Sequence, residues 1–446
     1  MCSNISYESN YIDGKKKSKA YRNQGSTLGA TALIAGTTIG AGVLALPTAT
    51  APSGFLPSSG ALIVAWFYML ISGLLIAELS INRMGETGRY GVGLLDLYKS
   101  NLGEKLGWIG SGAYFFLHYA VMVAYMAQGG ANLGSILHNF GVDTMSVHGL
   151  DQALFAAAVG GSVYFMRPNL VEKINNLLVV GVIASFLGII AIGAQSADFT
   201  SLVAMENQHP QFVADAFPIC FLSLVYHNVV PTVVVQLEGD RKKITTSMIA
   251  GTVVPLVMFL AWNAVILGNV IGSNGGLDKG IDPIALLKSD GIGGETLSIL
   301  VTSFSELAVT TSLIGFIYGL LDGLTDIAGL PIKGPKFDQW KPLLFTGVLA
   351  PPLLLSLGNP DIFYSALDSA GAFGVSTLFL VLPPIMIWKY RYGEENQTKP
   401  LMTKPMVPFG KIPLAGLWKA AATLIVEQGA DKLGLIDYVK HLFDGR

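Results

Sequence analysis

The chain has 446 residues, of which 51% are hydrophobic and only 13% are charged. Soluble domains average about 25% charged residues, so the composition favours an integral membrane protein and excludes an ordinary soluble domain. The formal net charge of −2 gives no sign of nucleic-acid binding, and the two cysteines, Cys2 and Cys220, cannot form a disulfide framework.

After a polar tail at residues 1–27, the chain contains ten long apolar runs. About 20 apolar residues are needed for a helix to cross the hydrocarbon core of a bilayer. We therefore expect an all-α membrane protein with about ten transmembrane helices. The expected spans are 28–48, 60–81, 111–138, 151–166, 176–195, 213–236, 247–271, 296–321, 342–357 and 361–388, of which the fourth and ninth are short.

The basic residues support this number of spans. If the N-terminus is cytoplasmic, 26 of the 28 lysines and arginines fall in cytoplasmic segments, and only Lys279 and Lys288 fall outside. A membrane protein is expected to concentrate basic residues in its cytoplasmic loops. We therefore predict a multi-pass protein of a cell (inner) membrane with both termini in the cytoplasm.

The C-terminal segment 389–446 contains no uninterrupted apolar run of 18 residues. The stretch LAGLWKAAATLIV is interrupted by Lys419 and followed by Glu427. It is expected to form a cytoplasmic tail, with an amphipathic surface helix or an eleventh span as alternatives.

Ten spans divide into two sets of five that enter the membrane from opposite sides. Residues 28–200 would form the first five-helix repeat and residues 201–388 the second. In transporters built from such inverted repeats, the first helix of each repeat is broken near the midplane. Both corresponding positions carry helix-weakening residues, in GTTIGAGVLALP at 36–47 and in SLVYHNVVPTVV at 223–234. The pattern predicts a 5+5 inverted repeat with helices 1 and 6 broken.

A broken helix exposes backbone groups that are expensive in lipid, so they must line a buried cavity or bind a ligand. Free N–H groups at the start of a half-helix suit a carboxylate, and free carbonyls suit an ammonium group or a metal cation. Such a site suits the zwitterion of an amino acid. Close helix packing is the alternative explanation for the glycines.

The two motifs, with YHNVVPTVV followed by LEGD, resemble the aromatic amino acid permease family, the tryptophan and tyrosine permeases of the amino acid/polyamine/organocation superfamily. FLHYAVMVAYMAQGGANL in span 3 and TTSLIGFIYGLLDGLTD in span 8 add to the resemblance, which covers roughly residues 26–388. It implies the leucine-transporter-type fold and uptake of an aromatic amino acid with a proton. Members of the family are usually described with eleven spans. Whether this chain forms an eleventh span in its C-terminal segment is therefore undecided from the sequence.

We therefore expect the substrate-binding residues to lie at the two breaks and on span 3. Tyr114, His118, Tyr125, Gln128 and Asn132 share one face of span 3, and polar faces of membrane helices look inward. Interhelical hydrogen bonding is the alternative role for this face. The candidate substrate-binding residues are Gly36, Thr37, Thr38, Gly40, Gly42, Tyr125, Gln128, Tyr226, His227 and Asn228. Asn228 is also a plausible N-cap for the second half of span 6.

The coupled ion is expected to be a proton. Histidine titrates near pH 6.5, which makes His227 and His118 candidate proton carriers, and Glu306 is a third because an ionised carboxylate at mid-membrane is costly. The hydroxyls of Thr310 and Thr311 allow a sodium site as the alternative. Glu78 and Asp368 lie nearer the span ends, where structural or gating roles are expected.

The sequence therefore predicts a secondary active transporter that imports tryptophan or tyrosine by proton symport. It carries no recognisable enzyme motif, and we expect no catalytic residues, no bound cofactor, no metal site and no nucleic-acid partner. Its partners would be the lipid bilayer, the small-molecule amino acid and the co-transported proton. A sodium-coupled amino acid symporter, a non-transporting amino acid sensor and a passive channel are the alternatives.

Overall fold

A computed structural model describes residues 6–12, 15–21, 25–87, 93–144, 147–274, 282–288, 294–359, 361–393, 403–408 and 410–433. The elements are β1 (Ser6–Ile12), β2 (Lys15–Tyr21), α1 (Thr27–Thr38), η1 (Ala41–Ala45), α2 (Leu46–Thr50), η2 (Ala51–Ser53), α3 (Phe55–Thr87), α4 (Leu94–Leu102), α5 (Glu104–Asn139), α6 (Leu150–Phe165), α7 (Pro168–Ser196), α8 (Phe199–Val203), η3 (Met205–Asn207), η4 (Pro210–Ala216), α9 (Phe217–Ser223), η5 (His227–Val229), α10 (Val230–Gln236), α11 (Arg241–Asn274), α12 (Pro283–Lys288), α13 (Gly294–Ala328), α14 (Pro335–Gly358), α15 (Phe363–Ser369), η6 (Ala370–Val381), α16 (Leu382–Tyr392) and α17 (Lys411–Lys432).

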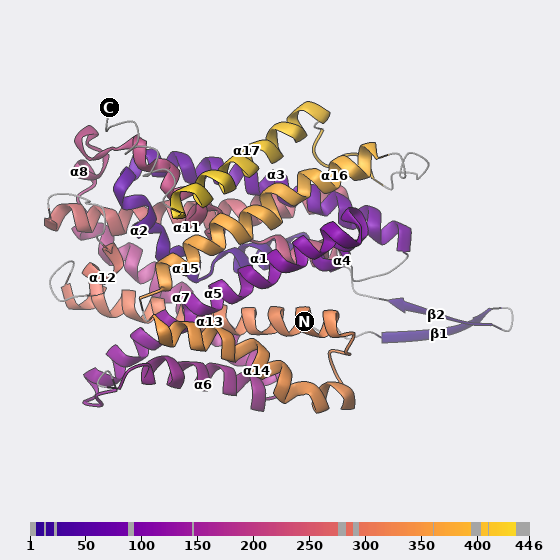
Figure 1. Ribbon diagram of the computed structural model, residues 1–446, viewed down its shortest axis with the longest axis horizontal. Helices are drawn as coiled ribbons and strands as arrows, with labels where there is room; N and C mark the ends of the chain where they lie inside the picture. Colours follow the sequence, from indigo (N-terminus) through magenta and orange to yellow (C-terminus); the bar gives the residue numbers. More distant parts are fainter. Residues whose placement is uncertain are drawn as a thin grey trace.

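The long helices run side by side along the longest axis of the molecule, as expected for a membrane bundle (Figure 1). The short helices α8 and α12 lie at one end, which we call the α12 end. The β1–β2 hairpin lies at the other end, which we call the hairpin end; β1 and β2 pair antiparallel, with Ser6 opposite Tyr21. The sequence analysis predicted only a polar tail where this hairpin lies.

Eight of the described helical segments are long and apolar enough to cross a membrane, and a ninth is obtained if α1 and the segment after it count as one bent span. The predicted fourth span corresponds to α6, whose 16 residues extend only about 24 Å. The described helices therefore identify an integral membrane protein, whereas the ten-span count and the 5+5 repeat remain predictions.

The first predicted span is interrupted at its glycines. α1 is capped by Ser26, whose hydroxyl accepts a hydrogen bond from the Gly29 N–H at 2.9 Å, and it ends at Thr38. Gly40 then adopts an extended conformation with φ −132° and ψ −177°, and the chain restarts as η1. The two helical parts meet at 47°. The break therefore lies inside GTTIGAG, where the sequence placed it.

The sixth predicted span is interrupted as well. α9 ends at Ser223, and the chain becomes helical again at His227, with Tyr226 at φ −139° and ψ 2°. The predicted capping role of Asn228 is wrong, because the residue preceding α10 is Val229 and no side chain caps that helix. Pro231 lies in the first turn of α10, where its missing N–H leaves no hydrogen bond unmade.

The C-terminal segment contains a 22-residue helix, α17, which packs along η6 and α16. The Nζ of Lys411 at its start lies 5.1 Å from the ring centre of Tyr392, and Lys432 at its end forms an ion pair with Asp368 at 2.5 Å. α17 therefore runs antiparallel to the tenth predicted span and reaches the α12 end of the bundle (Figure 1). It is not among the helices apolar enough to count as spans.

Candidate functional site at the two helix breaks

The two broken helices touch at their breaks. The Ser223 hydroxyl donates a hydrogen bond to the Gly42 carbonyl at 3.0 Å, and both groups are buried. A β-carbon on Gly42 would lie 3.3 Å from the Ser223 Cα, so glycine permits this approach. The predicted pair of breaks is therefore one local structure, in which the backbones of two helices 181 residues apart in sequence meet.

At the first break, the predicted residues divide into two groups. Gly40 and Gly42 lie in the non-helical and 3-10 segments, where backbone groups leave the α-helical pattern. Thr37 and Thr38 still belong to the last turn of α1, and their hydroxyls donate to the Leu33 carbonyl at 2.7 Å and the Ile34 carbonyl at 2.9 Å. Gly36 is also in α1 and has open space beside it.

At the second break, Tyr226 and His227 are fully buried. The Tyr226 hydroxyl donates to the Met69 carbonyl of α3 at 3.2 Å. The His227 ring stacks on Phe379 of η6, with ring centres 4.5 Å apart and planes 21° apart, and its two ring nitrogens have no hydrogen-bond partner among the described residues. These two side chains therefore point toward α3 and η6.

Asn228 is the third predicted residue of the second break. Its Oδ1 is buried and has no hydrogen-bond partner among the described residues. A buried amide oxygen without a partner carries a desolvation penalty, which a ligand with an N–H group would relieve. Of the three predicted residues here, Asn228 and His227 both keep buried side-chain polar atoms without a hydrogen-bond partner among the described residues, whereas the Tyr226 hydroxyl is bonded to Met69.

Helix α13 approaches the first break from the other side. A β-carbon on Gly40 would lie 3.3 Å from the hydroxyl oxygen of Ser312, which also shares a hydrogen bond with Tyr125 of α5. The hydroxyl of Thr311 donates instead to the Leu307 carbonyl of its own helix at 2.9 Å. Of the three neighbouring α13 hydroxyls, Thr310, Thr311 and Ser312, it is Ser312 that contacts the first break.

An aromatic group continues from Tyr125 along the interface of α5 and α13. Phe316 lies edge-on to Tyr125 with ring centres 5.7 Å apart, and 5.1 Å from the ring of His118. The Nδ1 of His118 forms a hydrogen bond with the Tyr114 carbonyl at 2.8 Å, and its ring is only 3% exposed. His118 is thus a packed residue of this interface, and the predicted polar stripe of span 3 partly serves interhelical contacts.

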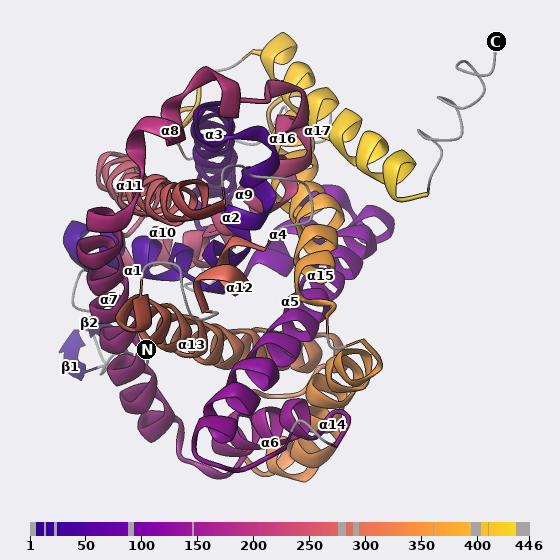
Figure 2. The ribbon, with the colours of Figure 1, turned by 90° about the vertical axis from the view of Figure 1, so that its left-hand side faces the viewer.

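A cavity of about 610 Å³ lies toward the α12 end of the bundle, and its lining includes Leu44 and Thr48, which follow the first break. Figure 2 views the molecule from this end and shows α12 near the centre of the bundle. The cavity is lined by Leu44, Thr48, Ala49, Pro52, Gln128, Ala131, Asn132, Ser135, Asp215, Asp282, Ile284, Ala285, Ser305, Phe363 and Tyr364. Its volume is in the range typical of small-molecule sites.

Polar and aromatic groups occupy different parts of the cavity wall. Gln128 donates from its side-chain nitrogen to the Asn132 Oδ1 at 2.9 Å, and Asn132 in turn donates to the Ser305 hydroxyl at 2.9 Å. Among the described residues of the lining, Asp215 and Asp282 are charged and none is a lysine or arginine. The cavity therefore combines an amide wall, negative charge and two aromatic rings.

Sequence reasoning found only part of this cavity. Gln128 was predicted because it lies on a polar helical face, whereas Asp215, Asp282, Phe363 and Tyr364 were missed. These four lie at three helix ends, of η4, α12 and α15, that are distant from one another in the sequence. No local pattern brings such positions together.

Glu306 lies on α13 and is partly buried, next to Ser305 of the cavity wall. Among the described residues there is no group of three histidine, cysteine, aspartate or glutamate side chains that could hold a metal ion. The assignments of His227, His118 and Glu306 to proton coupling, and of Thr310 and Thr311 to sodium, remain predictions.

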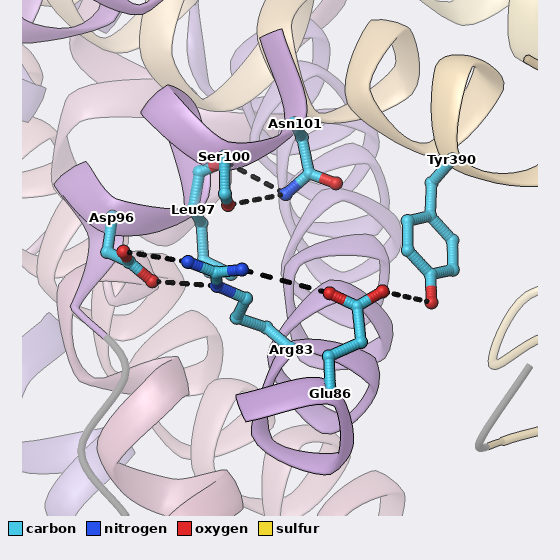
Figure 3. A network of polar contacts seen from close by, with 7 residues as sticks. All are labelled: Arg83, Glu86, Asp96, Leu97, Ser100, Asn101 and Tyr390. Atoms are coloured by element: carbon cyan, nitrogen blue, oxygen red, sulfur yellow. Dashed lines mark hydrogen bonds and ion pairs between the residues drawn. The ribbon is translucent and has the colours of Figure 1, made fainter. Parts of the chain in front are cut away.

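Ion pairs join the helices at the hairpin end. The Arg83 Nε donates to Asp96 at 3.1 Å, and the Tyr390 hydroxyl donates to Glu86 at 3.2 Å, which connects α3 to α4 and α16 (Figure 3). Glu78 and Arg391 form a buried pair with an N–O distance of 2.6 Å. These contacts tie α16 to α3.

Glu78 also holds the segment after α16. Its Oε2 accepts a hydrogen bond from the Met406 N–H at 2.7 Å, and Arg391 donates to the Val407 carbonyl at 3.1 Å. Both contacts are consistent with the structural role expected of Glu78. Asp368, the other residue expected to be structural, pairs with Lys432 of α17.

Comparison with known proteins shows which family this chain is similar to. The profile of the tryptophan/tyrosine permease family matches residues 23–409. A tryptophan-specific transport protein of Haemophilus influenzae is 29% identical over 380 residues, covering 82% of this chain and 87% of the relative. Tyrosine-specific transport system 1 of the same organism is 27% identical over 384 residues, covering 83% and 90%. The low affinity tryptophan permease of Escherichia coli K12 is 28% identical over 384 residues, covering 82% and 87%.

Proposed function

Because the chain belongs to the tryptophan/tyrosine permease family, we propose that it imports tryptophan or tyrosine across a cell membrane by proton symport. The family and its named relatives are transport proteins, so the chain is a permease and not an enzyme. The main support for a binding site here is the contact of the two breaks at Gly42 and Ser223, together with the cavity of about 610 Å³ that begins at Leu44.

In this proposal the substrate carboxylate binds the backbone N–H groups around Gly40 and Gly42, where the first helix restarts. Asn228 receives the ammonium group, because its buried Oδ1 has no hydrogen-bond partner among the described residues. The aromatic side chain occupies the adjoining cavity, where Phe363 and Tyr364 offer ring faces. Gln128 completes the cavity wall from span 3, and Tyr125 lies next to Ser312 near the first break.

Coupling to an ion supplies the energy for accumulation. A membrane potential of 100 mV provides about 2.3 kcal/mol for each charge moved, which supports roughly 50-fold accumulation of a neutral substrate carried with one proton. His227 is the first candidate for the proton because it lies at the second break. With the predicted orientation the cavity opens outward, and the protein alternates this state with an inward-facing one.

The test is uptake into proteoliposomes. Labelled tryptophan, tyrosine and leucine are offered under a pH gradient alone and under a sodium gradient alone. We expect a pH gradient to drive accumulation of an aromatic amino acid and not of leucine. Accumulation driven only by sodium would replace the proton proposal and direct attention to Ser312, Thr310 and Thr311. Binding without uptake under either gradient would favour the sensor alternative.

The proton site is tested with histidine variants. We expect His227→Gln to abolish accumulation driven by the pH gradient while exchange of labelled for unlabelled substrate continues. His148→Gln is the matched control, because His148 is exposed and lies at the end of the bundle. Full coupling in His227→Gln would exclude His227 and leave His118 and Glu306 as the candidates.

A further inference from the structure

Helix η6 has an unusual backbone hydrogen-bond pattern. It connects α15 to α16 and is π-helical over Ala370–Val381. The N–H of Leu382 donates to the Thr377 carbonyl, five residues back instead of four. π-helical turns are rare and occur frequently at functional sites.

The residues that follow explain which carbonyls this pattern leaves without a backbone donor. Pro383 and Pro384 have no N–H. In α16 the next available donor, Ile385, pairs four residues back with Val381. The carbonyls of Leu378, Phe379 and Leu380 therefore receive no backbone hydrogen bond.

Three hydroxyl groups from other helices satisfy these three carbonyls in order. Tyr98 of α4 donates to the Leu378 carbonyl at 2.9 Å. Ser72 of α3 donates to the Phe379 carbonyl. The Tyr68 hydroxyl of α3 lies 3.1 Å from the Leu380 carbonyl and 2.8 Å from the Leu417 carbonyl of α17, so these two carbonyls share its one hydrogen. Unpaired carbonyls are costly inside a membrane bundle, so these hydroxyls stabilise the segment.

The three hydroxyls differ in one respect. If the segment wound as an ordinary α-helix, the Leu382 N–H would pair with Leu378, four residues back, while the prolines would still leave Phe379 and Leu380 without donors. Ser72 and Tyr68 are thus needed in both hydrogen-bond registers. Tyr98 is needed only in the π-helical register.

We propose that η6 is a hinge that can exchange between π-helical and α-helical registers, and that Tyr98 is a positioning residue whose hydroxyl holds the π-helical one. This goes beyond the transport function proposed above, because it identifies the element that moves. Only the link between this hinge and alternating access rests on the proposed transport function.

The surroundings of η6 indicate what the exchange would move. α16 is fixed to α3 by the pairs Glu78–Arg391 and Glu86–Tyr390. On the other side of η6, α15 carries Phe363 of the cavity wall. Gaining or losing one residue in the register rotates one part of a helix against the other by about 100° and shifts it by about 1.5 Å.

The same segment also contacts the second break. Phe379 lies within η6 and stacks on His227. A change of register would therefore alter the cavity wall and the packing of the broken helix together. This is the coupling that alternating access requires between a binding cavity and a broken helix.

The experiment measures the position of α15 without transport. Phe363→Cys is introduced into a Cys2→Ser background, in which Cys220 is fully buried, and its labelling rate with a maleimide is measured in detergent without substrate. Tyr98→Phe is then added. We expect a change in labelling rate of about tenfold, because one buried carbonyl loses its donor only in the π-helical register.

Two comparisons separate positioning from simple stabilisation. Tyr119→Phe removes a matched hydroxyl bond, from Tyr119 to the Gly347 carbonyl at 2.7 Å, outside η6. Ser72→Ala removes a donor that both registers need. We expect Ser72→Ala to lower the thermal stability and both variants to leave the labelling rate unchanged.

A rescue variant completes the test. Pro383→Ala supplies a backbone N–H five residues after Leu378, so it should return the labelling rate of Tyr98→Phe to that of the parent. The proposal is overturned if Tyr98→Phe labels like Tyr119→Phe, if Ser72→Ala changes labelling as much as Tyr98→Phe, or if Pro383→Ala gives no rescue. Because no step uses substrate, these results do not depend on the proposed function.

Discussion

At the residue scale, the candidate site depends on small side chains that allow backbones to approach. Gly42 accepts a hydrogen bond from Ser223, and Gly40 lies against Ser312. Each contact joins one break to another helix, and a larger residue at either glycine would require the serine to move. Close helix packing, the alternative explanation for the glycines, therefore accounts for these contacts, and their role in substrate binding stays a prediction.

The Ser223–Gly42 hydrogen bond gives a prediction at this scale. Ser223→Ala removes the buried hydrogen bond that joins the two breaks, which we expect to lower the free energy of unfolding by about 1 kcal/mol and to weaken substrate binding. Thermal unfolding in detergent and binding of labelled tryptophan measure the two effects. Ser185→Ala is the control, since that hydroxyl bonds only carbonyls of its own helix. Equal behaviour of the two variants would contradict the prediction.

At the element scale, the helix ends at the hairpin end are held by a buried ion pair. The Glu78 and Arg391 side chains are 1% and 5% exposed, and the carboxylate also accepts the Met406 N–H. Removing one member of a buried pair leaves an uncompensated charge, which is strongly destabilising. This pair therefore holds α3, α16 and the following segment together.

We expect Glu78→Gln to lower the free energy of unfolding by about 3–5 kcal/mol and to free the segment around Met406. Thermal unfolding and limited proteolysis at residues 403–408 measure these effects. The control is Lys99→Met, which breaks an ion pair with Asp326 whose side chains are 44% and 57% exposed; it should change stability by less than about 1 kcal/mol. A loss no larger than that of the control would show that the Glu78 pair is not structural.

At the scale of the whole molecule, the two ends of the bundle differ. At the hairpin end, the residue before α1 is bonded to the end of α10, where the Gly25 N–H donates to the Gln236 carbonyl at 3.0 Å. The cavity lies toward the α12 end. The structure therefore represents a state with its cavity toward one side of the membrane, which is the outer side in the predicted orientation.

The orientation is tested by labelling single cysteines in intact cells with an impermeant maleimide. We expect Ala285→Cys, an exposed cavity residue of α12, to react from outside and to be protected by tryptophan. Lys99→Cys at the hairpin end should react only after permeabilisation. The reverse pattern would invert the predicted topology.

A third cysteine locates the end of α17. Leu433 is 75% exposed and follows Lys432, which pairs with Asp368 at the start of the tenth predicted span. From this packing we expect Leu433→Cys to react from the same side as Ala285→Cys, as an eleventh crossing helix would require. Labelling only after permeabilisation would instead support the predicted cytoplasmic C-terminus and a helix that does not cross the membrane.

The sequence by itself determined the class of protein, the family and the position of both helix breaks. These properties follow from local causes: apolar runs of membrane length, and the glycines and proline that weaken a helix where they stand. The tertiary structure decided what each polar side chain does. It directs Tyr226 and His227 toward α3 and η6, uses the hydroxyls of Thr37 and Thr38 within α1, and brings Ser312 to the first break. Asp215, Asp282 and Phe363 meet only because helices distant in sequence pack together, and no periodicity within one helix records which neighbour its side chains will face.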